Sequence, residues 1–330
     1  MRSLGVAAAL VVSVALAACS GTAPGPTAST QPAPTSADAS PPPSASPTAD
    51  AASPFFSVTT QADVAYERAL ADGREEDAAL IKRIADTPQA VWLGEWMGSG
   101  AASSRARDVT RDAEAAGHIP IFVIYAIPGR DCGLHSAGGL PQEEYVKFIE
   151  GIATAIDGRA TWIVLEPDAL AQLGDCEGQG DRAGLLREAA RILDEHGAEV
   201  FLDAGNSGWR SPEDTAERIQ LIGTEHLAGF STNVSNYHST ADEREWGEKV
   251  SAMVGLPFVT DTSRNGNGSN GEWCNPRGRA LGEPPALLGG QGMIATLWVK
   301  APGESDGACN GGPPAGAWWE EVALELARNA

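Results

Sequence analysis

The feature that most constrains the fold is an alternation of short apolar runs with longer amphipathic stretches. Seven apolar runs are predicted to be strands, at 91–94, 119–127, 162–166, 200–204, 229–234, 258–262 and 293–299. The stretches between them keep helical spacing, as in Tyr145, Phe148, Ile149, Ile152 and Ile156. Strands that alternate with helices form a parallel sheet, and strands buried on both faces are continuous apolar runs, as 121–124 is.

A polar side chain ends or follows nearly every predicted strand. These side chains are Glu95, Tyr125, Asp168, Asp203, Asn233, Asp261 and Lys300. In a β/α barrel the carboxyl ends of all strands meet on one face, and that face carries the functional groups. An open doubly wound sheet is the alternative, but the number of polar strand ends favours the barrel. We therefore predict an α/β fold, a single distorted, incomplete barrel of about seven parallel strands.

The first 54 residues do not follow this pattern. Arg2 precedes an apolar run at 4–18 that is too short for a stable membrane span, which is typical of a secretion signal. The run ends in Leu16-Ala17-Ala18-Cys19, which resembles a bacterial lipobox; a plain signal peptide cleaved nearby is the alternative. Residues 20–54 are rich in Ala, Ser, Thr and Pro and cannot form a core. We predict a lipoprotein signal peptide at 1–18, a disordered tether at 19–54 and one folded domain at 55–330.

Cysteine usage fits a protein outside the cytoplasm. Without Cys19, the chain retains Cys132, Cys176, Cys274 and Cys309, an even set that suits two disulfides in any of three pairings. Their spacing does not suit a metal site, so we expect no metal and no other cofactor.

The formal net charge of −21 excludes nucleic acid and anionic membranes as partners that are held by charge. We therefore expect that the protein contacts the membrane only through a lipid on Cys19. We also expect a monomer. It would lie on the outer face of the cell membrane, or be secreted if the lipid is absent.

Acidic side chains at three strand ends predict acid–base chemistry. Hydrolysis of a glycosidic bond needs one protonated carboxyl group and one carboxylate. Asp168 follows one strand, Asp131 follows the neighbouring strand, and the loop at 302–307 contains Glu304 and Asp306. A second carboxylate beside the first would raise its pKa and keep it protonated near neutral pH. A single loop aspartate is more often a helix cap or a surface charge, but three acidic loops at strand ends favour a site.

Three tryptophans, Trp92, Trp209 and Trp273, lie in or after these strand ends. A flat indole can stack on the apolar face of a pyranose, which predicts a cleft for a polysaccharide. Core packing is the alternative, and it is expected for Trp162, Trp318 and Trp319. The G-x-G-x-x-G match at 266–271 precedes Trp-Cys-Asn-Pro instead of a helix, so it does not predict a dinucleotide site.

Six motifs, in order along residues 90–310, resemble glycoside hydrolase family 6, the inverting cellulases. They are Tyr125 with Arg130-Asp131-Cys132, Leu165-Glu166-Pro167-Asp168, Leu202-Asp203-Ala204-Gly205, Asn233-Val234-Ser235-Asn236-Tyr237, Asp261-Thr262-Ser263-Arg264-Asn265-Gly266, and Trp298-Val299-Lys300 with Gly303-Glu304-Ser305-Asp306-Gly307. The resemblance implies a distorted barrel that hydrolyses β-1,4-glucosidic bonds in cellulose, soluble β-glucans or cello-oligosaccharides with inversion. We expect endo cleavage, because 203–306 leaves little room for long covering loops.

Two other functions remain as alternatives. A cellobiohydrolase of the same family would carry the same motifs and enclose its site with two long insertions. A lipid-anchored sugar-binding protein would share the signal, the tether and the tryptophans, but it needs two lobes and no reactive acid pair. The single barrel-like alternation disfavours the binding protein.

The resemblance also implies a role for each matched residue. Asp168 would be the general acid, and Asp131 the neighbour that raises its pKa. Asp306 would be the candidate base, and Tyr125 would lie beneath the distorted sugar. The substrate-binding positions would be Trp92, Asp203, Asn206, Trp209, Asn233, Trp273, Lys300 and Glu304.

The chain departs from the family's motifs at a few positions. Asn206 stands where endoglucanases of the family usually carry a histidine, and Ala126 and Gly129 replace common asparagines. The serine that the family carries in the loop after Cys132 would either be Ser136 or be absent. By the same comparison, the disulfides would be Cys132–Cys176 and Cys274–Cys309.

Overall fold

The computed structural model describes residues 53–330. The predicted signal peptide, Cys19 and nearly all of the predicted tether lie outside the described residues. The strands are β1 (Val91–Gly94), β2 (Ile121–Tyr125), β3 (Thr161–Leu165), β4 (Ala198–Asp203), β5 (Gly229–Thr232), β6 (Phe258–Asp261), β7 (Ala286–Leu287) and β8 (Met293–Leu297). The helices are α1 (Gln61–Ala71), α2 (Glu75–Ala85), α3 (Ser99–Ala116), α4 (Gln142–Ile156), α5 (Arg182–Glu195), α6 (Pro212–Ile222), α7 (Thr240–Val254) and α8 (Glu320–Asn329), with single 3₁₀ turns η1 (Glu95–Met97) and η2 (Asp131–Gly133).

The strands form one sheet in the order β1-β2-β3-β4-β5-β6-β8-β7. All neighbours pair in parallel except β7, which pairs antiparallel with β8. The seven predicted strands are therefore confirmed, with boundaries that differ by a few residues. The two-residue strand β7 was not predicted, because so short a strand has no periodicity that a sequence could reveal.

The barrel is incomplete between β1 and β8. Within residues 53–330, no strand ladder joins these two strands. Two hydrogen bonds cross the gap: the Ala90 N–H donates to the Trp298 carbonyl at 2.9 Å, and Trp92 Nε1 donates to the Val299 carbonyl at 2.9 Å. The first residues of β1 therefore lie beside the carboxyl end of β8 at an open seam.

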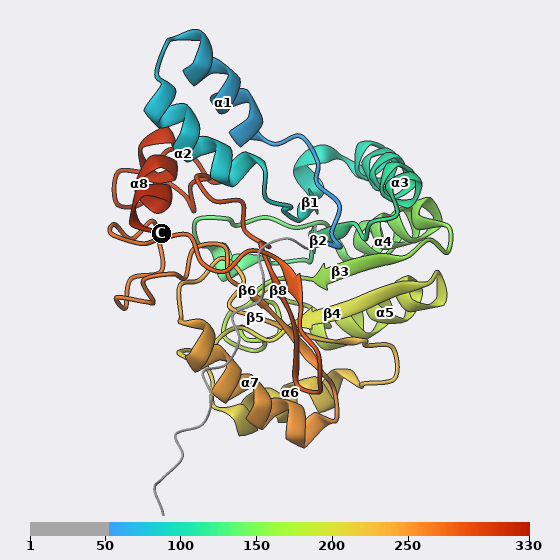
Figure 1. Ribbon diagram of the computed structural model, residues 1–330. Coiled ribbons are helices and arrows are strands. Elements are labelled where there is room, and N and C mark those ends of the chain that lie inside the picture. The colour runs from blue at the N-terminus through green and yellow to red at the C-terminus, as the bar shows by residue number, and fades with distance from the viewer. Residues whose placement is uncertain (1–52) are drawn as a thin grey trace, which may run out of the picture. The chain divides into compact units, whose positions relative to one another are not determined.

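Helices α3 to α7 cover the outside of the sheet (Figure 1). Their apolar faces pack on it; α4 begins after Pro141 and carries the side chains whose helical spacing was noted, and α5 begins after Asp181. The carboxylate of Asp181 accepts the Gly184 N–H at 3.0 Å, as an N-cap does. A second cluster fills the inside of the barrel with Val123, Val164, Phe201, Val259 and other side chains. The strands are thus buried on both faces.

The helices α1, α2 and α8 form a separate layer at one end of the sheet (Figure 1). Ala65, Ile81, Ile84 and Leu326 are among the buried side chains that hold this layer together. The start of α1 is fixed locally, because the Asp63 carboxylate accepts the Thr60 N–H at 2.7 Å and the Thr60 hydroxyl at 2.8 Å. This cap holds the first turn of α1 at the site described below.

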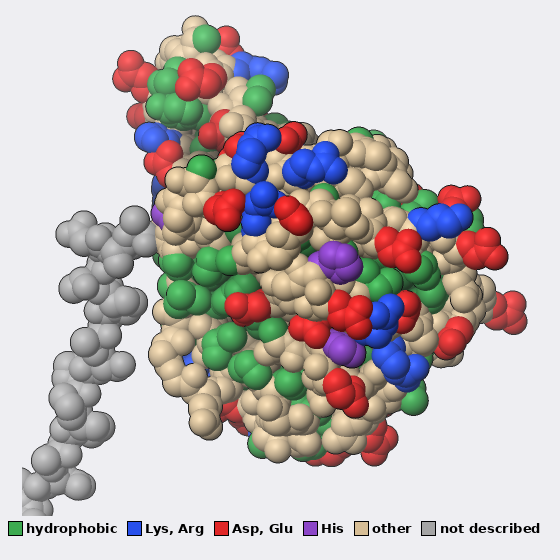
Figure 2. All heavy atoms as spheres, turned by 90° about the vertical axis from the view of Figure 1, so that its right-hand side faces the viewer, with side chains coloured by type: hydrophobic (Ala, Val, Ile, Leu, Met, Phe, Trp, Pro, Cys, Tyr) green, Lys and Arg blue, Asp and Glu red, His purple; other side chains and the backbone are tan. Residues whose placement is uncertain are grey.

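The outer helical face carries acidic and basic side chains scattered over its surface (Figure 2). None of the helices within 53–330 is long and apolar enough to cross a membrane.

Candidate active site

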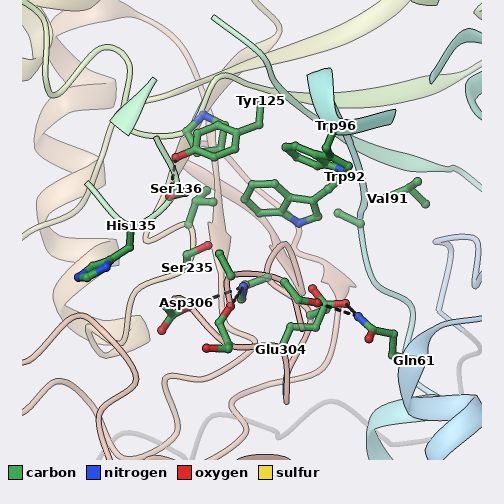
Figure 3. A pocket seen from close by; sticks show the side chains of 18 of the residues that line it. Gln61, Val91, Trp92, Trp96, Tyr125, His135, Ser136, Ser235, Glu304 and Asp306 are labelled. Carbon is green, nitrogen blue, oxygen red and sulfur yellow. Dashed lines mark hydrogen bonds and ion pairs between the residues drawn. The ribbon is translucent and has the colours of Figure 1, made fainter. Parts of the chain in front are cut away.

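A cavity of about 930 Å³ opens at the carboxyl ends of the strands (Figure 3). All four predicted catalytic residues line it, together with four of the predicted substrate-binding residues. These eight are Tyr125, Asp131, Asp168 and Asp306, with Trp92, Trp273, Lys300 and Glu304. The fold therefore joins residues from both ends of the domain in one cavity.

The backbone at these strand ends adopts unusual conformations. Left-handed φ angles occur at several non-glycine residues near the site, among them Asp131 (55°), Cys132 (47°), Glu166 (49°), Asp168 (70°), Asn233 (63°), Ser235 (59°) and Asn275 (49°). Such conformations cost about 1–3 kcal/mol each and persist only where surrounding contacts hold them. Their clustering marks this region as the strained, functional part of the fold.

Asp168 follows β3 and is partly buried at the cavity wall. Its backbone N–H donates to Asp203 Oδ1 at 2.9 Å, which holds the left-handed residue in place. Burial raises the pKa of Asp168 to about 7, and the nearby charge of Asp131 adds to the effect. The Asp168 carboxyl group is therefore protonated in a large fraction of molecules near neutral pH, as a general acid must be.

A chain of polar contacts connects Asp131 to Asp168. Asp131 Oδ2 accepts the Ser136 N–H at 2.7 Å and the Ser136 hydroxyl at 2.9 Å. The Ser136 hydroxyl lies 3.3 Å from the Tyr125 hydroxyl, which in turn donates to Asp168 Oδ2 at 3.5 Å. Ser136 thus links Asp131 to Tyr125.

Arg130 holds the loop that carries Asp131 and Ser136 in place. It is buried, its Nε donates to the Ser136 carbonyl at 2.7 Å, and one terminal nitrogen donates to the Tyr125 carbonyl at 2.8 Å. The same nitrogen pairs with the Glu95 carboxylate. The guanidinium carbon also lies 4.5 Å from the centre of the Tyr125 ring, so it stabilises both ends of the chain of contacts.

The other acid of this strand end, Glu166, is fully buried behind the wall. Its carboxyl group accepts the backbone N–H groups of Ala126 and Ile127 at 3.0–3.1 Å. Burial raises its pKa to about 7, although these hydrogen bonds act in the opposite direction. Glu166 therefore ties the ends of β2 and β3 together and does not reach the cavity.

Asp306 is held by positive charge, by a tyrosine hydroxyl and by one backbone N–H. Its carboxylate pairs with Arg264 at 2.9 and 3.1 Å and accepts the Tyr237 hydroxyl at 3.1 Å and the Asn275 N–H at 3.0 Å. Burial raises the pKa of Asp306, but the charges of Arg264 and Lys300 and the hydrogen bonds from Asn275 and Arg264 together hold the pKa below its usual value. Asp306 is therefore ionised near neutral pH.

Another part of the cavity wall combines Trp92 of β1, Glu304 of the loop after β8 and Gln61 at the start of α1 (Figure 3). The Trp92 ring meets the Tyr125 ring edge to face, with 5.4 Å between ring centres. The Glu304 carboxylate accepts the side-chain N–H of Gln61 at 2.6 Å. The Lys300 ammonium donates to the Ser305 carbonyl at 3.3 Å and lies 3.7 Å from Asp306.

Four predicted substrate-binding residues do not line this cavity. Asp203 and Asn233 are fully buried, and their oxygens accept hydrogen bonds from neighbouring backbone and side-chain donors. Asn206 is also buried, and its Oδ1 accepts the Gly208 N–H at 3.0 Å. Trp209 is 37% exposed in the loop after β4.

The sequence matches a model of glycosyl hydrolases family 6 over residues 51–330. This match covers most of the chain, including every element that forms the cavity. The chain belongs to glycosyl hydrolases family 6.

The chain is also similar to curated proteins that are named endoglucanases. The chain is 53% identical over 278 residues to endoglucanase A of Cellulomonas fimi, which covers 84% of this chain and 61% of that protein. It is 42% identical over 270 residues to endoglucanase 1 of Streptomyces halstedii, covering 77% of this chain and 82% of that protein. The chain thus spans about three fifths of the length of the first relative.

The fold also matches that of a solved family 6 enzyme. The structure of the endoglucanase Cel6 from Mycobacterium tuberculosis, in complex with methyl-cellobiosyl-4-deoxy-4-thio-β-D-cellobioside, has a TM-score of 0.79 and 38% sequence identity. The match covers 84% of this chain and 98% of that chain. The predicted distorted barrel is therefore shown both by the coordinates and by this family 6 neighbour.

Two disulfides fasten the loops of this family 6 site. Cys132 pairs with Cys176 and Cys274 pairs with Cys309, as the resemblance implied. The first bond holds the loop that carries Asp131, and the second holds the loops that carry Trp273 and Asp306. The His135 ring lies within 4.8 Å of both Cys274 and Cys309, but those sulfurs are bonded to each other and are not free to ligate a metal.

Some residues of the family 6 site, in the cavity wall or directly behind it, were not predicted as site residues from the sequence. Gln61 has no signal in the sequence, because it lies in a helix 243 residues from its partner Glu304. Arg264 lies within a matched motif, but pairing with Asp306 requires the fold. Trp96 could have been noticed as an aromatic residue just beyond the strand-end residue Glu95.

Proposed function

We propose that this protein is an endo-acting β-1,4-glucanase that hydrolyses cellulose or related soluble β-glucans with inversion. The observation that carries the proposal is Asp168, a partly buried acid with a pKa of about 7 in a cavity that also contains the ionised Asp306. One protonated and one ionised carboxyl group at a single site is the arrangement that glycoside hydrolysis needs.

In the first step, the Asp168 carboxyl group donates its proton to the glycosidic oxygen while the bond from that oxygen to the anomeric carbon breaks. The hydroxyl of Tyr125 fixes the orientation of the Asp168 carboxyl group through their 3.5 Å contact. Positive charge that develops on the sugar ring is stabilised by the negative charge of Asp306. The electron pair of the broken bond leaves with the departing chain.

In the same step, a water molecule attacks the anomeric carbon from the opposite face, and its proton passes to a base. Asp306 was the candidate base from the sequence, but a carboxylate with a lowered pKa and several donors on its oxygens is a weak proton acceptor. We therefore assign charge stabilisation to Asp306. We assign removal of the proton to Asp131, through Ser136 and the water chain that it would hold.

The roles of the predicted substrate-binding residues depend on whether they line the cavity. Trp92, Trp273, Lys300 and Glu304 line the cavity and would bind the sugars on the non-reducing side. The exposed Trp209 would be the platform on the leaving side. The buried residues Asp203, Asn206 and Asn233 would act by holding the strand-end loops in shape.

Endo cleavage is supported by the exposed rim of the cavity and by the relatives. Trp273 is 47% exposed, and Val64, which also lines the cavity, is 55% exposed, so a chain could enter from the side. The two relatives reported above are named endoglucanases. A cellobiohydrolase of the same family is the second candidate.

The test is to compare viscosity loss with reducing-sugar release on carboxymethylcellulose. An endo enzyme lowers viscosity early, when few reducing ends have formed, whereas an exo enzyme releases reducing sugar with little loss of viscosity. Proton NMR of the first products from cello-oligosaccharides then tests inversion, which predicts the α-anomer before mutarotation. Retention of the β-anomer, or no cleavage at all, would contradict the proposal.

We also propose that a lipid on Cys19 and the tether at 19–54 hold the enzyme domain at the outer face of the cell membrane. The two disulfides support a location outside the cytoplasm, where such bonds persist. Radiolabelled palmitate should be incorporated into the wild type and not into Cys19→Ala. Detergent-phase partitioning that is the same in both proteins would contradict the anchor.

A further inference from the structure

Trp96 lines the cavity and is 56% exposed. It is therefore more exposed than Trp273, the other rim tryptophan of the cavity at 47%. Large aromatic side chains gain most from burial, so an indole that stays exposed beside a ligand cavity marks a contact surface. The catalytic steps proposed above do not use this side chain.

The Trp96 ring packs closely against the backbone of Gly94. Gly94 ends β1 with an extended backbone (φ −141°), and a Cβ atom at this position would overlap the six-membered ring of the indole. Glycine is therefore needed here for close packing and not for its own conformation. The Arg130 guanidinium carbon lies 5.3 Å from the Trp96 ring centre and supports the ring further.

Packed on Gly94, the Trp96 ring lies next to Trp92 but closer to the solvent. Both side chains come from the β1 end, and Figure 3 shows their rings near each other on the same wall of the cavity. Trp92 is tied inward by its hydrogen bond to the Val299 carbonyl and by its contact with Tyr125. Trp96 has no such inward tie among the described residues, and its ring is open to a ligand.

We propose that Trp96 is a further sugar-stacking platform, which binds a glucosyl unit of the substrate chain outside the units nearest to Asp168. The apolar face of a β-linked pyranose would lie on the exposed indole, as it does on aromatic side chains generally. Gly94 is the positioning residue that lets the ring lie flat. This inference rests on the proposed glucanase function.

The test compares kcat/KM for cellohexaose with kcat/KM for cellotetraose. Trp96→Ala should lower the cellohexaose-to-cellotetraose ratio by about tenfold, because only the longer chain reaches an outer platform. Gly94→Ala should lower the same ratio, since the new methyl group displaces the ring without removing it. Trp96→Phe should restore part of the ratio.

Leu221→Ala is the matched control, because Leu221 is also 56% exposed but lies on α6, away from the cavity. It should leave the ratio at the wild-type value. If Trp96→Ala and the wild type have the same cellohexaose-to-cellotetraose ratio and the same kcat/KM values, Trp96 is not a stacking platform. If Trp96→Ala loses kcat/KM equally on both substrates, Trp96 does not bind an outer glucosyl unit. If the wild type itself cleaves neither substrate, the proposed function fails, which is a different result from either of these.

Discussion

The carboxylate of Asp203 accepts the backbone N–H of Asp168 at 2.9 Å. Asp203 is fully buried at the end of β4, and the same carboxylate also accepts the Gly205 N–H and the Ser231 hydroxyl. It therefore holds the left-handed backbone of the proposed acid without reaching the cavity. Placement of the acid depends on this contact from the neighbouring strand.

Asp203→Ala should lower kcat by about 10–100-fold and change KM little, because the acid loses its position while the substrate wall remains. Burial, with the charge of Asp168, raises the pKa of Asp203 well above its usual value, so a neutral amide is a fitting replacement. Asp203→Asn should therefore recover most of the rate. Steady-state kinetics on a cello-oligosaccharide would measure both variants, and equal losses in the two would contradict the positioning role.

The contact of Gln61 with Glu304 predicts an effect on substrate binding. Gln61→Glu places a second acidic group at the 2.6 Å contact with Glu304 and should raise KM several-fold with kcat nearly unchanged. Gln61→Ala should have a smaller effect on KM. Gln220→Ala, an exposed side chain on α6, is the control and should behave as the wild type. A fall in kcat without a change in KM would show that α1 acts in some other way.

The buried pair of Arg264 and Asp306 predicts a large effect on stability. Arg264→Gln leaves the buried carboxylate without its main partner and should lower the free energy of unfolding by about 3–5 kcal/mol. Arg277→Gln removes an exposed pair with Glu321 and Glu325 and should cost only about 0–1 kcal/mol. Urea denaturation followed by tryptophan fluorescence would compare the two variants. Similar losses of unfolding free energy in both variants would contradict the stabilising role of the buried pair.

The raised pKa of Asp168 predicts that stability depends on pH. The folded pKa of about 7 lies above the value in the unfolded chain, so the folded state binds the proton more tightly. The resulting stability is fully present below about pH 4 and is lost as the pH rises through about 7. Asp168→Asn removes the ionisation, so its melting temperature relative to wild type should be higher at pH 8 than at pH 5. A difference that is independent of pH would contradict the raised pKa.

The strands and the strand-end acids could be predicted from the sequence, because buried parallel strands are continuous apolar runs and their polar ends are conspicuous. Which way an acid at a strand end points could not be predicted. Glu166 and Asp168 lie two residues apart, so the regular alternation of a strand would place both side chains on the same face. Instead, Glu166 is buried behind the wall and Asp168 reaches the cavity, because the backbone of both residues is left-handed. The alternation of side chains along a strand does not continue through such residues.

Long-range contacts were also beyond the sequence. The pairing of Gln61 with Glu304 depends on how α1 packs against the end of the barrel, and no local pattern encodes it. The pairing of Arg264 with Asp306 likewise joins two loops that follow different strands. The disulfide pairing came from the family resemblance, since the spacing alone allowed three arrangements.

The most direct test of the central claim, that Asp168 is the general acid, is the rate of Asp168→Ala on two substrates that differ in their need for a proton. Carboxymethylcellulose has a poor leaving group, so the variant should lose about 10²–10⁴-fold in rate. A 2,4-dinitrophenyl β-cellobioside has a leaving group that departs without protonation, so the variant should retain most of the wild-type rate on it. Equal losses on both substrates, or no loss on carboxymethylcellulose, would contradict the assignment.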